Sequence, residues 1–182
     1  MPHSERYQID RPQSHELDEL ARIEREAASR FSELDLPQVL RDSVLSRGDL
    51  ESAATQGHVW VARDRFEKCV VGFAAAQPLD RGMHLRELDV LSLHGRQGLG
   101  SRLLQTVIEW SAKAGFSSIT LTTFKHIPWN APFYLSEGFR PIAQNEMGPE
   151  LQGLWAQEAK EGLDPIRRIA LIKTLTVDGA GH

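Results

Sequence analysis

The chain has 182 residues and a mass of 20.4 kDa, with 41% hydrophobic and 25% charged residues, a composition typical of one soluble globular domain and not of a disordered or fibrous chain. A formal net charge of −4 argues against general nucleic-acid binding, no segment looks membrane-spanning, and the single cysteine, Cys69, excludes a disulfide framework and a multi-cysteine metal site. We therefore expect a cytoplasmic protein that folds as one domain over residues 1–182.

The first third of the chain predicts a strand, two helices and a β-hairpin. A short strand is expected at 7–11, and Pro37 opens a second, shorter helix over 36–47. Apolar strands at 58–64 and 68–78 flank the charged turn of the hairpin. Between the first strand and Pro37, Ser14 caps a helix with apolar residues at helical spacing, namely Leu17, Leu20, Ile23, Ala27 and Phe31.

The middle of the chain predicts a strand, a glycine-rich turn, a helix and a second strand. The first strand covers 84–93, the helix begins near Gly98 and stops at Gly115, and the second strand covers 117–124. This order makes a right-handed βαβ unit with the glycine turn at the carboxyl end of its first strand. Open α/β sheets bind ligands at that end.

The last third predicts a short helix over 130–138, a strand over 139–142, a helix or helical loop over 149–162 and a final strand over 166–177. A flexible tail is expected at 176–182. With the preceding elements, this succession predicts an α/β fold with a mixed sheet.

The glycine turn resembles an anion site. Gly95, Gly98 and Gly100 remove side chains where the following helix presents N–H groups that lack intrahelical acceptors. The alternative is a tight connection that needs glycine only for packing. The order G-x-x-G-x-G differs from the dinucleotide fingerprint, and no lysine follows the last glycine as a nucleoside-triphosphate loop requires.

Two motifs together resemble the GNAT superfamily of N-acetyltransferases. "GRQGLGS" carries Gly98 and Gly100 at the positions of the family's Arg/Gln-x-x-Gly-x-Gly/Ala motif, and "FYLSEGF" supplies its tyrosine and Gly-Phe pair, here Tyr134, Gly138 and Phe139. The resemblance covers residues 84–142. It implies a mostly antiparallel mixed sheet with splayed fourth and fifth strands, acetyl-CoA as co-substrate, and acetyl transfer to a primary amine by direct attack through a tetrahedral intermediate.

The chain departs from the family pattern at three places. Gly95 stands where the motif has Arg or Gln, so Arg96 or Gln97 must serve. Ile127 replaces the asparagine that many members carry seven residues before the tyrosine, and threonines occupy the region of the fifth strand where some members place a glutamate base. The base is therefore not identified by the resemblance.

The resemblance implies a cofactor site on the turn and on the fourth strand. Backbone N–H groups from 96 to 101, at the positive end of the helix dipole, would surround the pyrophosphate, and the backbone of 88–90 would pair with the pantetheine arm. The candidate cofactor-binding residues are Leu88, Asp89, Val90, Arg96, Gln97, Gly98, Leu99, Gly100, Ser101 and Asn130.

Catalysis needs an acid for the departing thiolate and a base for the amine. Tyr134 matches the family's general acid, and its alternative role is a packed aromatic side chain. Glu87 and His84 precede the expected strand bulge and are candidate bases, although both also fit surface positions. A backbone N–H near Val90 would hold the oxyanion. The histidines lack metal-ligand spacing, so no metal is expected.

The acceptor is expected to be a small-molecule or peptide amine. Acidic residues in the segments that line the family's acceptor site favour a cationic amine, although solvated helix faces have the same composition. No nucleic acid or membrane partner is expected, and a homodimer is left open. Alternatives are a non-catalytic acyl-CoA-binding or regulatory module and transfer of a longer acyl group. The acidic residues are Glu33, Asp35, Glu146, Glu150, Glu158, Glu161 and Asp164.

Overall fold

The computed structural model describes residues 6–176, which divide into two units. The N-terminal unit comprises 6–32, 38–77 and 85–107, and the C-terminal unit comprises 33–37, 78–84 and 108–176. Most of the expected tail, from 177 onward, lies outside the described residues.

Strand pairing gives an α/β fold with a mixed sheet, as predicted. The hydrogen-bonded order is β1-β2-β3-β4-β5-β7-β6. The β1–β2, β2–β3, β5–β7 and β6–β7 ladders are antiparallel and the β4–β5 ladder is parallel. The strands are β1 (Tyr7–Asp10), β2 (Val59–Asp64), β3 (Cys69–Leu79), β4 (Gly82–Val90), β5 (Ser118–Phe124), β6 (Arg140–Pro141) and β7 (Arg168–Thr174).

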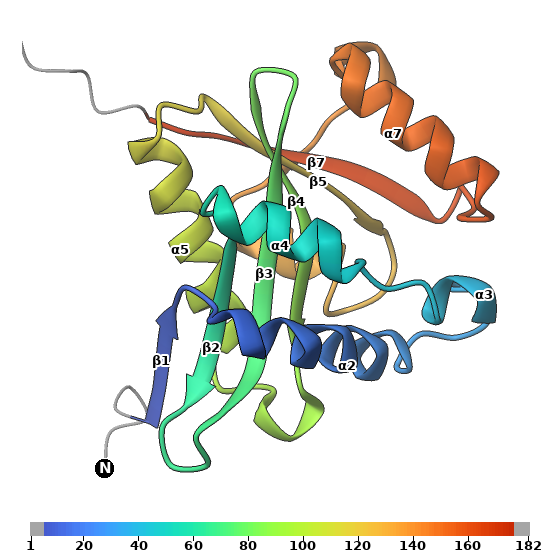
Figure 1. The fold of residues 1–182 in the computed structure, drawn as a ribbon. Helices are drawn as coiled ribbons and strands as arrows, with labels where there is room; N and C mark the ends of the chain where they lie inside the picture. The colour runs from blue at the N-terminus through green and yellow to red at the C-terminus, as the bar shows by residue number, and fades with distance from the viewer. Residues whose placement is uncertain (1–5, 177–182) are drawn as a thin grey trace, which may run out of the picture. The chain divides into compact units, whose positions relative to one another are not determined.

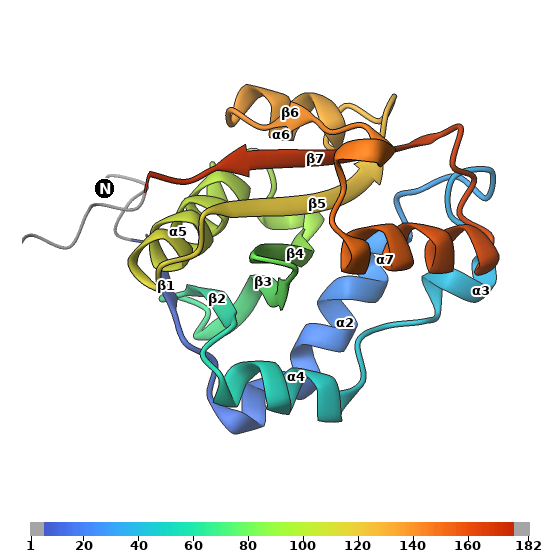
Figure 2. The ribbon, with the colours of Figure 1, turned by 90° about the horizontal axis from the view of Figure 1, so that it is seen from above.

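In the N-terminal unit, α2 (Leu17–Ala28) and α4 (Arg47–Thr55) lie together on one face of β2 and β3 (Figures 1 and 2). The short helix η1 (Ser14–Glu16) leads into α2, so Ser14, the expected cap, lies inside η1, and Gln13 is the N-cap. Burial of apolar side chains from both layers is the main force that holds the helices on the sheet. This core contains Leu17, Leu20, Ile23, Leu50, Val59, Val61, Val70, Phe73 and Ala75.

Two further predicted boundaries are wrong. The helix expected over 36–47 is only the single turn α3 (Gln38–Arg41), and α4 follows as a separate helix that was not predicted. The strand expected to reach residue 93 ends at Val90, and the chain then forms the short helix η2 (Ser92–His94). After the glycine turn, α5 (Leu99–Lys113) begins where the sequence predicts it.

In the C-terminal unit, β5 and β7 pair along their full lengths and β6 lies on the other side of β7 (Figure 2). The helix α6 (Ala131–Ser136) precedes β6, and η3 (Gln144–Glu146) leads into α7 (Pro149–Lys160). The start of α7 buries Leu151 in a core with Ile142, Met147 and Ala170. None of the helices in the described part of the chain is both long and apolar enough to cross a membrane.

Candidate active site

The predicted phosphate turn has an unusual backbone. Arg96 and Gly98 both adopt positive φ angles, +57° and +74°, so two left-handed residues lie within three positions. A Cβ atom on Gly98 would meet nothing within 4 Å, which leaves space beside the backbone. Gly95 has a φ of −65°, and a Cβ there would lie 3.1 Å from the Ser92 carbonyl oxygen. A Cβ atom at position 95 would therefore crowd the turn, whereas Gly98 has a backbone conformation that other residues rarely adopt.

The N-terminus of α5 supplies donors beside that space. The first bond into the helix runs from the Arg102 N–H to the Gly98 carbonyl, over 3.0 Å, so the N–H groups of Leu99 and Gly100 precede it. The positive end of the helix dipole reinforces them as anion donors. This geometry fits the expected pyrophosphate site, and the binding roles of residues 96–101 stay predictions.

The fourth strand approaches β3 closely at the positions predicted for the pantetheine arm. A Cβ on Gly72 of β3 would lie 2.8 Å from the Asp89 carbonyl oxygen and 3.0 Å from Val90 Cγ2. The Leu91 N–H then bonds the Val71 carbonyl at 2.8 Å. Glycine at position 72 thus permits a close contact that another residue would block. The backbone role of 88–90 stays a prediction.

His84 lies inside the sheet rather than at the surface position that the sequence also allowed. Its side chain is buried, and its Nδ1 is 3.0 Å from Thr120 Oγ1, across the β4–β5 ladder that pairs Met83 with Ile119 and His84 with Thr120. Glu87, the other candidate base, is partly exposed further along β4. The splay of β4 and β5 beyond this short ladder stays a prediction.

The interaction between two carboxyl groups, those of Asp89 and Glu24, was not predicted from the sequence. Desolvation raises the pKa of Asp89 on β4 to about 8 and that of Glu24 on α2 to about 7, and the charge of Glu24 further raises the pKa of Asp89. The Glu24 carboxylate accepts a hydrogen bond from the Leu45 N–H at 3.0 Å, which partly offsets its shift. An aspartate inside the apolar run "LDVLSL" was the only local signal of this pair.

This pair predicts a pH-dependent stability. In the unfolded chain both carboxyls are ionised above about pH 4, whereas the folded protein holds their protons up to pH 7 or 8. Their contribution to stability is therefore complete below about pH 4 and is lost as the pH rises to about 8. We expect Asp89→Asn to flatten the decline of the thermal midpoint between about pH 5 and 8.5. An exposed control, Glu33→Gln, should retain the full decline, and an unchanged slope in Asp89→Asn would contradict the assignment.

Tyr134 lies on α6 in the C-terminal unit and is partly exposed. Its ring makes edge contacts with Phe133 and Phe139, with centroid separations of 5.1 and 5.8 Å. The turn that ends this segment contains Gly138 at a φ of +87°, as the predicted glycine stop requires. The aromatic contacts fix the ring, and the acid role of its hydroxyl group stays a prediction.

Asn130 immediately precedes α6 and is buried. Its side-chain oxygen accepts a hydrogen bond from the Thr123 hydroxyl, which ties the start of α6 to the end of β5. The backbone carbonyl oxygen of Asn130 accepts a hydrogen bond from the Tyr134 N–H at 3.1 Å. The structure therefore gives Asn130 a role in placing α6, whereas its proposed contact with the cofactor stays a prediction.

Three of the acidic residues expected at the acceptor site are paired with arginines, and one of them, Glu146, lies 3.7 Å from Arg140. The buried Asp35 accepts two bonds from Arg167, at 2.9 and 2.6 Å, and lies 3.0 Å from His126 Nε2. Glu158 lies 3.1 Å from Arg168 in the same unit. These pairings offset the negative charge, so they weaken the composition argument for a cationic acceptor.

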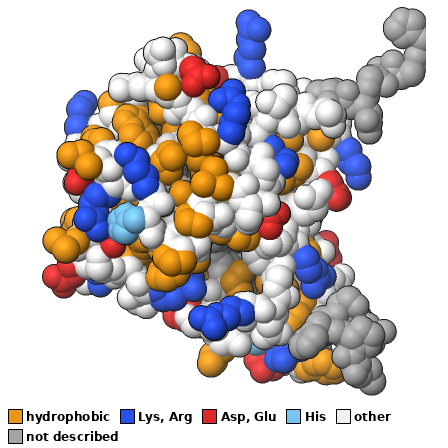
Figure 3. Space-filling view, turned by 180° about the vertical axis from the view of Figure 1, so that it is seen from behind, with side chains coloured by type: hydrophobic (Ala, Val, Ile, Leu, Met, Phe, Trp, Pro, Cys, Tyr) orange, Lys and Arg blue, Asp and Glu red, His pale blue; other side chains and the backbone are white. Residues whose placement is uncertain are grey.

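Exposed hydrophobic side chains lie next to the Asp35–Arg167 ion pair in the sequence. Figure 3 shows a face of the molecule on which hydrophobic groups gather among lysines and arginines. The large hydrophobic residues of the C-terminal unit that stay exposed are Leu34, Trp129, Leu135 and Ile166. Leu34 and Ile166 adjoin Asp35 and Arg167 in the chain, so the paired charges hold segments that present apolar groups to solvent.

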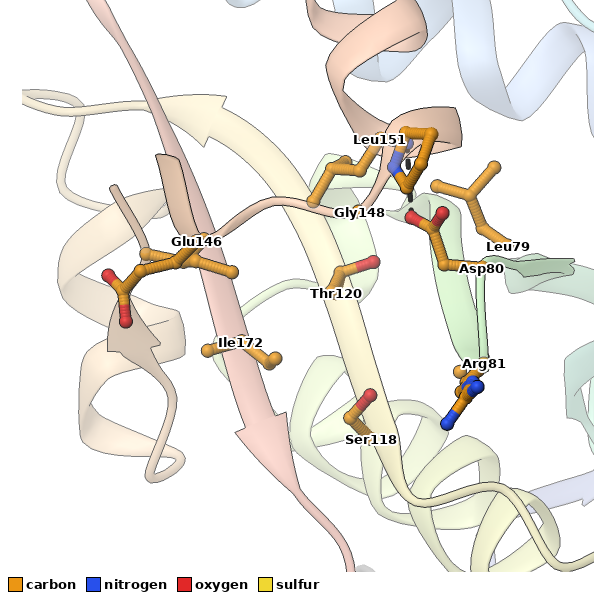
Figure 4. A pocket seen from close by; sticks show the side chains of 12 residues that line it. Leu79, Asp80, Arg81, Ser118, Thr120, Glu146, Gly148, Leu151 and Ile172 are labelled. Atoms are coloured by element: carbon orange, nitrogen blue, oxygen red, sulfur yellow. Dashed lines mark hydrogen bonds between the residues drawn. The ribbon is translucent and has the colours of Figure 1, made fainter. Parts of the chain in front are cut away.

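The C-terminal unit also contains a cavity of about 360 Å³ (Figure 4). Its walls are formed by β5, by β7, by the start of α7 and by the turn that joins β3 to β4. Thr120, the hydrogen-bond partner of His84, lines the cavity. Asp80 accepts hydrogen bonds from the Glu150 and Leu151 N–H groups at 3.0 and 3.2 Å, which fastens the turn to α7. The N-terminus of α7 is thus already capped by a carboxylate.

Within residues 6–176, one group could hold a metal ion: Asp64, Glu67 and His94. Arg6 donates to the Asp64 carboxylate at 2.6 and 2.8 Å and lies 3.5 Å from the Glu67 carboxylate. The guanidinium group therefore already supplies the positive charge that these acids need. The cluster is an ion-pair network in this structure.

The sequence pattern of the acetyltransferase (GNAT) family matches residues 17–139, and the chain belongs to this family.

Among curated proteins, the chain is 33% identical to human N-acetyltransferase 8 over 92 residues, which is 47% of this chain and 40% of that protein. It is 36% identical to mouse N-acetyltransferase family 8 member 3 over 70 residues, or 35% of this chain and 30% of the relative. The match thus spans well under half the length of these relatives.

Solved structures share the fold at low sequence identity. N-acetylglutamate synthase from Neisseria gonorrhoeae, complexed with coenzyme A and N-acetyl-glutamate, gives a TM-score of 0.71 at 18% identity, over 93% of this chain and 35% of that chain. The paia N-acetyltransferase from Thermoplasma acidophilum, in complex with coenzyme A, gives 0.65 at 15% identity, over 92% and 98% of the two chains. The mosquito protein named arylalkylamine N-acetyltransferase like 5b gives 0.68 at 17% identity, over 93% and 100% of the two chains.

Proposed function

We propose that this protein transfers an acetyl group from acetyl-CoA to a primary amine and that residues 1–182 act together as one acetyltransferase domain in the cytoplasm. The observation that carries the proposal is the turn before α5, where Arg96 and Gly98 take positive φ angles. Open space adjoins Gly98, and the first N–H groups of the helix lie at the positive end of its dipole. Those features suit a pyrophosphate, and two structures with the same fold contain coenzyme A.

The residues of this chain divide the chemistry. The N–H groups of residues 96–101 would bind the pyrophosphate, the backbone of 88–90 would orient the thioester, and an N–H near Val90 would stabilise the oxyanion. Tyr134 would give its proton to the departing thiolate, and Glu87 or His84 would take one from the attacking amine. Acetyl-CoA supplies the activated acyl group.

The acceptor is proposed to be an amine on a small molecule or a peptide. The names of the structural neighbours include an N-acetylglutamate synthase and an arylalkylamine N-acetyltransferase like 5b, so these names refer to amines of different kinds. The ion pairs of Arg167 with Asp35 and of Arg168 with Glu158 offset negative charge in the segments expected to line the acceptor site, so the charge of these segments does not favour a cationic amine over a neutral one. Neutral and cationic amines therefore belong in the same test.

The test is release of free thiol from acetyl-CoA in the presence of polyamines, arylalkylamines, amino acids and peptide N-termini. Amine-dependent thiol release with an acetylated product supports the proposal. Calorimetric binding of coenzyme A without turnover of any amine would instead favour an acyl-CoA-binding module. Faster release from longer acyl-CoA donors would favour the other alternative, an acyltransferase of longer chains.

The base is tested separately by the pH dependence of turnover. If Glu87 accepts the proton of the amine, Glu87→Gln should remove or displace the acidic limb of the profile of kcat/KM against pH. His84→Gln and Asp89→Asn serve as comparisons, because His84 is buried against Thr120 and the pKa of Asp89 is raised. An acidic limb that stays in place in Glu87→Gln shows that Glu87 is not the base.

A further inference from the structure

Tyr7, a residue of β1 far from the turn in sequence, contacts the turn directly. Its side chain is 2% exposed, and its hydroxyl group donates a hydrogen bond to Gln97 Oε1 at 3.0 Å. The same hydroxyl oxygen lies 3.0 Å from His94 Nδ1, and the two rings meet edge to face with centroids 5.8 Å apart. Because the hydroxyl proton points to Gln97, the His94 Nδ1–H is the donor in the second bond.

These two contacts hold both sides of the strained part of the turn. Arg96, with its φ of +57°, lies between His94 and Gln97. A left-handed arginine costs conformational free energy and persists only when surrounding contacts enforce it. Such strain is common at ligand sites, where it keeps donors in position before the ligand arrives.

Other contacts fix Tyr7 itself. Its carbonyl oxygen accepts a hydrogen bond from Arg102 in α5 at 3.0 Å, and its backbone pairs with Asp64 of β2. The neighbouring Arg6 binds the Asp64 carboxylate through two nitrogens. One residue of β1 is thus joined to η2, to the turn and to the first part of α5.

We propose that Tyr7 is a positioning residue that holds the turn at 94–98 in the conformation that binds the pyrophosphate of the co-substrate. This inference rests on the proposed function, because it concerns the same phosphate site. Tyr7 acts through Gln97 and His94 and does not touch the reacting atoms. Its removal therefore weakens co-substrate binding and leaves the chemical step intact.

Tyr7→Phe tests this role because it removes one oxygen and retains the ring. The dissociation constant for coenzyme A, measured by calorimetry, should rise about 5- to 50-fold, because the buried His94 and the partly buried Gln97 each lose a hydrogen-bond partner. The kcat at saturating acetyl-CoA should stay within about twofold of wild type. Gln8→Ala, on an exposed neighbour in β1, is the matched control and should leave the dissociation constant unchanged.

The double variant separates positioning from general packing. If Tyr7 acts through Gln97, then Gln97→Ala weakens binding and the pair Tyr7→Phe and Gln97→Ala weakens it less than the product of the single effects. An unchanged dissociation constant in Tyr7→Phe, or independent effects of the two changes, would overturn the proposal. Failure of the wild-type protein to bind coenzyme A would instead overturn the proposed function. Should Tyr7→Phe not fold, wild-type affinity in Gln97→Ala would likewise overturn the positioning role.

Discussion

Coenzyme A affinity is expected to collapse in the variant Gly98→Asp. A Cβ atom at position 98 would have no protein atom within 4 Å, so a carboxylate there would lie where we place the pyrophosphate. Gly98 is exposed, and two like charges about 4 Å apart near a protein surface repel by about 4 kcal/mol, so we expect affinity to fall by about 100-fold or more. The fold should persist, because a negative charge near the N-terminus of α5 interacts favourably with the helix dipole.

Gly98→Asn is the matched control for this change. Asparagine has nearly the same shape as aspartate and tolerates the φ of +74° at this position, but it carries no charge. Calorimetry and thermal unfolding on the three proteins separate the two effects. We expect Gly98→Asn to bind coenzyme A more weakly than wild type and much more tightly than Gly98→Asp. Wild-type affinity in Gly98→Asp would exclude this turn as the phosphate site.

The βαβ unit and the turn could be predicted because their signals are local. Glycines, a helix stripe and a β-branched strand occur in one continuous stretch, and α5 and β5 form close to where the pattern places them. The end of β4 could not be predicted, since the Ser92 N–H and hydroxyl group, where η2 begins, donate to the Glu26 carboxylate on α2, 66 positions away. The apolar character of "LSL" gave no sign of that contact.

The failure over 36–47 has a similar cause. The Leu45 N–H donates to the Glu24 carboxylate on α2 and not to a backbone carbonyl of a helix turn. The helix α4 begins two residues later, at Arg47. A local sign of α4 was present, because the Ser46 hydroxyl accepts the Asp49 N–H as an N-cap. The contact with Glu24 joins residues 21 positions apart and leaves no local pattern.

The candidate site was predicted only where it follows a motif. Gly98 was proposed from the glycine turn and Tyr134 from the resemblance to the family motif, and both roles stay predictions, whereas Tyr7 contacts the turn from 87 and 90 positions away in sequence. The raised pKa of Asp89 likewise depends on Glu24, which a different helix contributes. Supporting residues of this kind are set by packing between distant segments, so a sequence pattern does not reveal them.

The largest effect on the chemical step is expected from Tyr134→Phe. If the hydroxyl group protonates the departing thiolate, its loss should lower kcat by about 10²- to 10⁴-fold, the usual contribution of a general acid. The edge contacts of the ring with Phe133 and Phe139 do not involve the oxygen, so the packing of α6 should change little. Coenzyme A affinity should stay near the wild-type value.

Tyr7→Phe is the natural counterpart, because it removes the same atom from the other tyrosine of the chain. We expect the two variants to show opposite patterns: Tyr134→Phe loses kcat and retains affinity, and Tyr7→Phe loses affinity and retains kcat. The measurements are turnover with an active amine, calorimetric binding of coenzyme A and thermal unfolding. Near-normal kcat in Tyr134→Phe would exclude the acid role. A large drop in its thermal midpoint would mean that the hydroxyl serves packing, so that any loss of turnover reflects unfolding rather than a missing proton.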